Sequence, residues 1–212
     1  MLNAIVRRPV SPSEQPPILV LLHGLGADEN DLMGLAPQLD PRLLIVSIQA
    51  PIEYGNGGYA WFDIQWDADG VSVIPEQVLA SRDLLIDTLR HLPAALNAEG
   101  SGLLLGGFSQ GAIMSLGVAF AEPSLLSGVI SMSGRLLPDF VPANPLPGTS
   151  QLPYLVQHGT NDGVLPVQGS RDIREHLEKM GCPLTYREYP MAHEISIKSL
   201  ADVRDWISER LP

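Results

Sequence analysis

Short runs of consecutive apolar residues recur along this chain, and segments with a helical period separate them. Continuous apolar runs are typical of parallel strands that are buried on both faces of a sheet. The runs predict strands over residues 18–22, 43–48, 103–105, 128–132 and 154–157, and a strand-like segment follows at 184–189.

The intervening segments show the period of amphipathic or buried helices. A short helix is predicted over residues 31–39, with Asn30 or Asp31 as its N-cap. Pro75 suits the first turn of a longer amphipathic helix over residues 76–91. The almost wholly apolar segment 110–122 predicts a buried helix, and two more helices are expected near 167–180 and 194–210.

Regular alternation of strand and helix predicts an α/β fold, with a mostly parallel central sheet and helices on both of its faces. Residues 49–74 and 136–151 fit neither pattern and are rich in Gly and Pro, so we interpret them as long irregular loops. Loops of this length in a compact domain are usually functional or mobile.

Composition narrows the class of protein. With 212 residues, of which 45% are hydrophobic and 17% charged, the chain fits a single globular domain over 1–212. The formal net charge is −11 and the basic residues are scattered, which opposes binding to nucleic acid or to anionic membrane surfaces.

Targeting signals and cysteine usage point to the cytoplasm. No segment approaches the length of a membrane span, and the arginines after the short apolar start reverse the order of a secretory signal. The lone Cys182 cannot form an intramolecular disulfide and fits a reducing compartment. We therefore expect a cytoplasmic protein with no stable membrane insertion.

A strand, a sharp turn and a helix meet at one serine, in the run Gly107-Phe108-Ser109-Gln110-Gly111. This is the pattern of a nucleophile elbow, in which a strained turn exposes the serine and small residues two positions away on each side accommodate the turn. The pentapeptide alone is weak evidence, because a Gly-rich turn with a helix-capping serine has the same letters. The assignment of Ser109 as a nucleophile therefore depends on whether the chain also supplies a base and an acid.

A nucleophilic serine needs an imidazole base and a carboxylate to orient that base, and in this fold the acid and then the histidine follow the serine along the chain. His193 lies in the loop between the last predicted strand and the last helix, and Asp162 follows a buried strand, where active-site groups collect. Asp162 has an alternative role as a turn or capping residue. The candidates set aside are His23, His91, His158, His176, Asp139, Asp172 and Asp202.

Acyl transfer also requires two N–H donors for the oxyanion, one next to the nucleophile and one from a loop after an early strand. Gln110 supplies the first candidate and Leu25 the second, because Gly24 and Gly26 let the backbone at Leu25 approach a substrate closely. We expect His23 to order this loop by hydrogen bonding rather than to transfer protons. The loop lacks the lysine and glycine spacing of a phosphate-binding loop.

With these residues identified, the chain resembles the phospholipase/carboxylesterase family of α/β-hydrolases. The resemblance runs almost end to end, and its most specific carriers are the Phe-Ser-Gln triplet at the elbow and the Trp61-Phe62-Asp63 triplet. It implies an α/β-hydrolase fold without a large cap domain. It also implies Ser109 as nucleophile, His193 as base and then acid, Asp162 as orienter, and the amides of Leu25 and Gln110 as oxyanion hole.

Members of that family hydrolyse carboxylic esters and thioesters without a metal or other cofactor. The resemblance therefore implies a small-molecule ester as substrate, and we favour short-to-medium acyl chains over the alternatives of acyl-protein thioesters and lysophospholipids. An apolar pocket is expected, with Trp61 and Phe62 equally well placed in the core; its expected lining is Leu25, Tyr59, Trp61, Phe62, Leu165 and Met191.

The sequence also bears on a binding scaffold, on metal-dependent hydrolysis and on a homodimer. A hydrolase-like scaffold that binds a ligand without turning it over typically lacks a member of the triad, whereas this chain has candidates for all three. Metal-dependent hydrolysis has no support, because the histidines and carboxylates show no ligand spacing. Exposed apolar loop residues leave a homodimer open.

Overall fold

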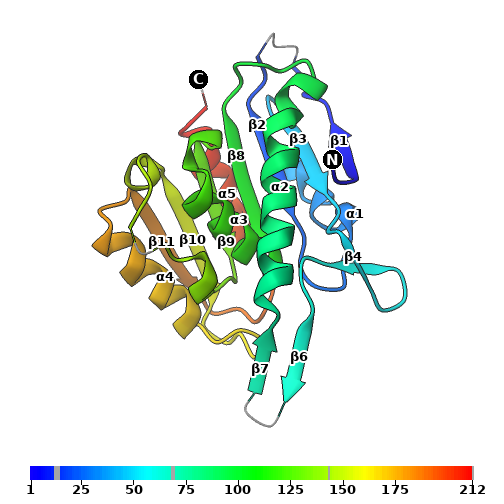
Figure 1. Cartoon of the computed structure of the whole chain (residues 1–212). Helices are drawn as coiled ribbons and strands as arrows, with labels where there is room; N and C mark the ends of the chain where they lie inside the picture. Colours follow the sequence, from blue (N-terminus) through cyan, green and yellow to red (C-terminus); the bar gives the residue numbers. More distant parts are fainter. Residues whose placement is uncertain (12–14, 68–69, 143, 212) are drawn as a thin grey trace.

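A seven-stranded sheet forms the centre of the molecule. The computed structural model describes residues 1–11, 15–67, 70–142 and 144–211. The strand order is β1-β3-β2-β8-β9-β10-β11, with β1 antiparallel to β3 and every other neighbouring pair parallel (Figure 1). The predicted α/β architecture is confirmed; the strands are β1 (Ala4–Arg7), β2 (Ile18–Leu22), β3 (Leu44–Ile48), β8 (Leu103–Phe108), β9 (Gly128–Met132), β10 (Tyr154–Gly159) and β11 (Leu184–Tyr189).

Helices cover both faces of the sheet. One face carries α2 (Pro75–Ala95), α3 (Gln110–Ala121) and α4 (Gln168–Lys179), which lie in front of the strands in Figure 1. The other face carries α1 (Glu29–Met33) and α5 (Ile197–Ser208). None of the described helices combines the length and the apolar character that crossing a bilayer requires.

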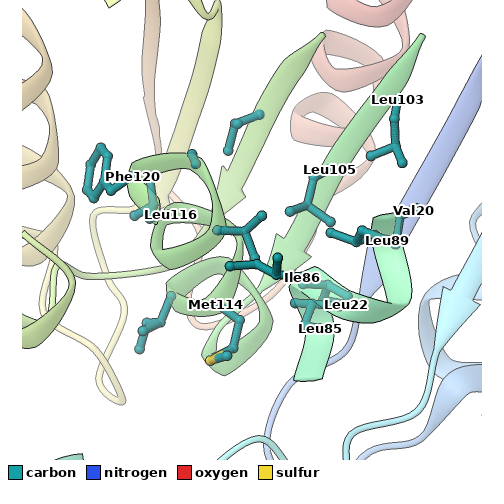
Figure 2. Close-up of a cluster of buried hydrophobic side chains, with 14 of the residues drawn as sticks. Val20, Leu22, Leu85, Ile86, Leu89, Leu103, Leu105, Met114, Leu116 and Phe120 are labelled. Atoms are coloured by element: carbon teal, nitrogen blue, oxygen red, sulfur yellow. The ribbon is translucent and has the colours of Figure 1, made fainter. Parts of the chain in front are cut away.

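Side-chain alternation along the strands divides the core into two layers. Val20 and Leu22 of β2 point to the layer under α2 and α3, whereas Leu19 and Leu21 point to the layer under α1 and α5. Figure 2 shows the first layer, where α2 and α3 pack side chains onto β2 and β8. Strands buried on both faces produce the continuous apolar runs seen in the sequence.

The structure differs from the sequence predictions at short or exposed elements. The first helix begins at Glu29, and its N-cap is Asp28, whose side chain accepts a hydrogen bond from the Asn30 N–H, so neither Asn30 nor Asp31 is the cap. The segment 49–74 is not wholly irregular. It contains two hairpins, β4 (Ile52–Tyr54) with β5 (Gly58–Ala60) and β6 (Ile64–Asp67) with β7 (Gly70–Val73).

Parts of the two stretches predicted to be irregular do lack strands. In the segment 136–151, the described residues form only two 3₁₀ turns, Pro138–Phe140 and Thr149–Gln151. Residues 68, 69 and 143, which fall within these stretches, lie outside the described residues. The hairpin of β6 and β7 projects from the same end of the sheet at which β2, β8 and β10 finish (Figure 1).

Candidate active site

Ser109 occupies the sharp turn between β8 and α3. Its φ of 55° and ψ of −118° lie in a region that L-residues rarely adopt, and its N–H donates to the carbonyl oxygen of Met132, 2.9 Å away. A Cβ at Gly107 would overlap the backbone of Gly111, and a Cβ at Gly24 would lie 3.3 Å from the Cβ of Ser109. The turn therefore requires glycine at its flanks, as the motif predicts.

Gly111, at the other flank of the turn, is packed still more tightly and gives a stability prediction. A Cβ at Gly111 would overlap the carbonyl oxygen of Leu22, at the point where α3 crosses β2. We expect Gly111→Ala to lower the free energy of unfolding by about 3 kcal/mol, because buried backbone must move apart to admit the methyl group. Urea denaturation would measure the change. Gly163→Ala is the matched control, since a Cβ there has nothing within 4 Å, and a Gly111→Ala midpoint equal to that of the control would contradict the prediction.

Three side chains from distant parts of the chain form a continuous hydrogen-bonded line. His193 follows β11, and its Nε2 lies 2.9 Å from the Oγ of Ser109 while its Nδ1 lies 2.7 Å from the Oδ2 of Asp162. A carboxylate only accepts hydrogen bonds, so Nδ1 carries the proton and Nε2 accepts from the serine hydroxyl. The Phe108 ring packs against the imidazole at a centroid separation of 4.8 Å. This is the geometry that proton transfer from the serine requires.

Asp162 is held as an ionised acceptor. Its side chain is fully buried, and its Oδ1 accepts hydrogen bonds from the N–H groups of Val164 (2.9 Å) and Leu165 (2.8 Å). Burial raises the pKa of this carboxyl, but the hydrogen bonds from His193 and from the two backbone amides outweigh burial and lower the pKa below its ordinary value. The His193 side chain is 16% exposed, so it remains reachable from the pocket.

His158 supports the acid, a role that sequence reasoning missed. Its Nε2 lies 2.8 Å from the carbonyl oxygen of Leu165 and 3.2 Å from the Oδ2 of Asp162, and the side chain is completely buried. Both neighbouring oxygens are acceptors, so Nε2 carries a proton and the ring fixes the turn that presents Asp162. The sequence holds the signal as a histidine at the end of a strand, four positions before the acid.

Two residues that line the pocket beside Ser109, Leu25 and Gln110, are the candidates for the oxyanion hole. Gln110 is the first residue of α3, and Leu25 lies in the loop after β2. Neither N–H donates a hydrogen bond to any described part of the chain. Both border the pocket that contains Ser109, and the N-terminus of α3 adds its dipole there. The pair matches the donor arrangement expected for an oxyanion hole.

His23 orders the loop that carries Leu25, as expected. Its Nδ1–H donates to the carbonyl oxygen of Gly24 (2.7 Å), and its Nε2 accepts from the N–H of Ala50 (3.0 Å). Burial lowers the pKa of this imidazole and keeps it neutral. A neutral ring with both nitrogens engaged connects the loop to the end of β3.

The side chain of Gln110 explains where Trp61 and Phe62 lie. Its Oε1 accepts from the N–H of Trp61 (3.0 Å), and its Nε2 donates to the carbonyl oxygen of Phe62 (2.8 Å). The indole N–H of Trp61 donates to the carbonyl oxygen of His23, and the ring is completely buried. Trp61 therefore belongs to the core, and the expectation that it lines the pocket is wrong.

The pocket beside Ser109 has a volume of about 390 Å³ and a mainly apolar lining. Of the expected lining residues, Leu25, Phe62 and Leu165 border it. Besides Trp61, two others do not. Tyr59 pairs with the backbone of Ala27 and faces a separate depression near Met1. Met191 is a buried residue of the loop that carries His193 and does not border the pocket.

Several lining residues could not be found from sequence patterns. They come from the β6–β7 hairpin, from α3, from the segment after β9 and from the loop after β10, and they are Ile64, Val73, Ile113, Arg135, Val164 and Pro166. Their approach to Ser109 depends on how the loops fold over the sheet edge, for which the apolar pattern carries no signal. Val164 is 66% exposed and lies at the mouth of the pocket.

Comparison with known proteins agrees with this architecture. The family model described as phospholipase/carboxylesterase matches residues 3–211. Esterase YpfH of Escherichia coli (strain K12) is 31% identical across 98% of this chain and 88% of its own length. Acyl-protein thioesterase 1 of Neurospora crassa is also 31% identical, across 92% of this chain and 86% of its own length.

Solved structures share the fold. The crystal structure of esterase PE8 superposes with a TM-score of 0.85 and 28% identity, covering 99% of both chains. Together with the family match over nearly every residue, this likeness extends well beyond the elbow motif to the order of the strands and loops around it. The chain belongs to the phospholipase/carboxylesterase family and is an ester-hydrolysing enzyme of the α/β-hydrolase fold.

Proposed function

We propose that this chain hydrolyses carboxylic esters of short-to-medium acyl chains by a two-step acyl-enzyme mechanism. The observation that carries the proposal is the hydrogen-bonded line from Asp162 through His193 to Ser109, with separations of 2.7 and 2.9 Å, at the wall of an apolar pocket. An ester carbonyl in that pocket would lie against the serine hydroxyl and the free N–H groups of Leu25 and Gln110 at the same time.

In the first step, the Oγ of Ser109 attacks the ester carbonyl while the Nε2 of His193 takes the hydroxyl proton. The N–H groups of Leu25 and Gln110 stabilise the oxyanion. The imidazolium then gives its proton to the leaving alkoxide, which departs as the alcohol and leaves an acyl group on Ser109. Asp162 stays ionised and stabilises the imidazolium.

In the second step, water attacks the acyl-enzyme. The Nε2 of His193 removes a proton from the water, the oxyanion forms again, and the same proton returns to Ser109 as the carboxylic acid is released. His193 accepts and donates the proton in both steps, so the proposed mechanism requires no metal or other cofactor. A cytoplasmic location and a single domain over 1–212 stay predictions from the sequence, and a homodimer stays open.

Pocket size supports the preference for short-to-medium acyl chains. A volume of about 390 Å³ lies near the lower end of the range for small-molecule sites, roughly 300–1,000 Å³. We expect kcat/KM for p-nitrophenyl esters to be highest between butyrate and octanoate and to fall at least about tenfold for palmitate, because a chain too long for the pocket must fold back or hold its ester carbonyl away from Ser109.

The same assay distinguishes the alternatives. A maximum at palmitate, or faster turnover of a palmitoyl thioester than of any short ester, would contradict the proposed substrate class and favour long-chain thioesters, the class named for the Neurospora crassa relative. A fluorophosphonate probe addresses catalysis itself, because it labels an activated serine and not an empty pocket. A folded protein that neither labels nor turns over any ester would be a binding scaffold.

A further inference from the structure

Arg135 is a positively charged residue in the lining of a pocket that is otherwise nearly uncharged. Apart from His193 it is the one ionisable side chain in the described lining, which contains no aspartate or glutamate. Asp162 is the carboxylate of the proposed triad. Its side chain is fully buried and already accepts hydrogen bonds from His193 and from two backbone amides. The Arg135 charge therefore has no counterion within the pocket wall.

Among the described residues, the Arg135 guanidinium group also has no partner outside the pocket. Its Nε is buried from solvent and has no hydrogen-bond partner among the described residues, and no ion pair joins Arg135 to an acid in that part of the chain. The chain has 24 acidic and 13 basic residues, and other arginines do pair, for example Arg42 with Asp40 and Arg171 with Glu188. A buried donor without a hydrogen-bond partner destabilises the folded protein. A ligand that accepts a hydrogen bond from it removes this penalty and therefore binds more tightly.

The backbone before Arg135 is fixed by a strained turn. Ser133, directly after β9, has a φ of 53°, and its N–H donates to the carbonyl oxygen of Gln157, 2.8 Å away. A Cβ at Gly134 would lie 2.8 Å from the Cβ of Ala112, so the chain is clamped against the start of α3. Strained turns of this kind persist where the surrounding structure holds them and are frequent at ligand sites.

We propose that Arg135 binds a carboxylate group of the substrate, so that the enzyme prefers esters carrying a negative charge on a short chain. The inference rests on the proposed ester hydrolysis and names its substrate class. A guanidinium offers two parallel N–H groups to a carboxylate, and the apolar residues around it keep the local dielectric constant low, which strengthens the pairing. The remaining apolar lining holds the methylenes between the carboxylate and the ester.

Matched charged and neutral esters test the inference. Monoethyl adipate carries its carboxylate on the acyl side, and ethyl adipamate replaces that group by a neutral amide of nearly the same shape. Acetoxybutyrate and acetoxybutyramide form the corresponding pair on the alcohol side. Release of ethanol or acetate, followed by chromatography, gives kcat/KM for each.

We expect the anionic member of at least one pair to be favoured about tenfold or more, the size of one charge-assisted hydrogen bond, and the favoured pair identifies the side of the ester that faces Arg135. Arg135→Gln should bring that ratio close to one, and Arg135→Lys should keep part of it because the charge remains. Arg204→Gln is the control, since Arg204 is an exposed residue of α5 paired with Asp205, and its ratio should equal that of the wild type.

The ester comparison tests the role of Arg135 separately from ester hydrolysis itself. A wild-type enzyme that hydrolyses both neutral esters and favours neither anionic partner overturns the role of Arg135 and leaves ester hydrolysis standing. A ratio that survives in Arg135→Gln also overturns it. If Arg135→Gln does not fold, the wild-type preference at rising salt concentration decides, because a preference that rests on charge must weaken with screening and one that rests on shape must not.

Discussion

Ser109→Ala is expected to lower the kcat for p-nitrophenyl butyrate by about a million-fold and to abolish labelling by a fluorophosphonate probe. The serine and the histidine of a triad act as one unit, so loss of the hydroxyl removes about as much catalysis as loss of the whole triad. His193 Nε2 would then have no hydroxyl to accept from, since its partner at 2.9 Å is the Ser109 Oγ. Persistent labelling of the alanine variant would show that another serine is the nucleophile.

A second substitution at the same position separates catalysis from backbone strain. Alanine keeps the Cβ that is strained at a φ of 55°, whereas glycine removes it, and both variants lack the hydroxyl. We expect Ser109→Gly to be inactive as well, but to have a free energy of unfolding about 1–3 kcal/mol higher than that of Ser109→Ala. Urea denaturation of the two variants measures the difference. Equal stabilities would mean that the elbow stores no strain.

The sheet was predictable where burial on both faces produces a continuous apolar run. β2 and β9, which are fully buried, begin and end at the residues that the pattern indicates. The bounds of the edge strand β11 also match, although its residues are mostly half-buried and its run is not continuously apolar. β1 was missed because this short edge strand alternates between exposed and half-buried positions. The two hairpins in 49–74 were missed for a related reason, since their strands are only three or four residues long.

The proposed triad could be located from sequence because each member follows a strand that the sequence pattern predicts. The order of acid and histidine after the serine, together with the positions of the other candidates in helices, in the Pro-rich loop or ahead of the acid, then left one candidate for each place. The pocket could not be located in this way. The Gln110 side chain forms hydrogen bonds to the backbone of Trp61 and Phe62, over 49 and 48 positions of the chain. Both rings are buried, and of the two only Phe62 borders the pocket.

The second large effect is expected for Asp162→Asn, which should lower kcat by about ten-thousand-fold while the serine remains in place. The N–H groups of Val164 and Leu165 donate to Oδ1, so the asparagine must keep its carbonyl oxygen there and turn its NH₂ group toward His193. The Nδ1 of His193 must then accept a hydrogen bond, which moves the ring proton to Nε2. With that proton, Nε2 can no longer receive the one from Ser109.

Labelling kinetics distinguish this wrong tautomer from a lost nucleophile. Asp162→Asn should react with a fluorophosphonate slowly but to completion, with a rate constant reduced in proportion to kcat, because the Ser109 hydroxyl is still present and only its base is compromised. Asp139→Asn is the control, since Asp139 is an exposed residue of a 3₁₀ turn and should leave both rates at the wild-type value. A folded Asp162→Asn variant with wild-type kcat would show that the 2.7 Å contact between Asp162 and His193 does not set the tautomer on which the proposed mechanism depends.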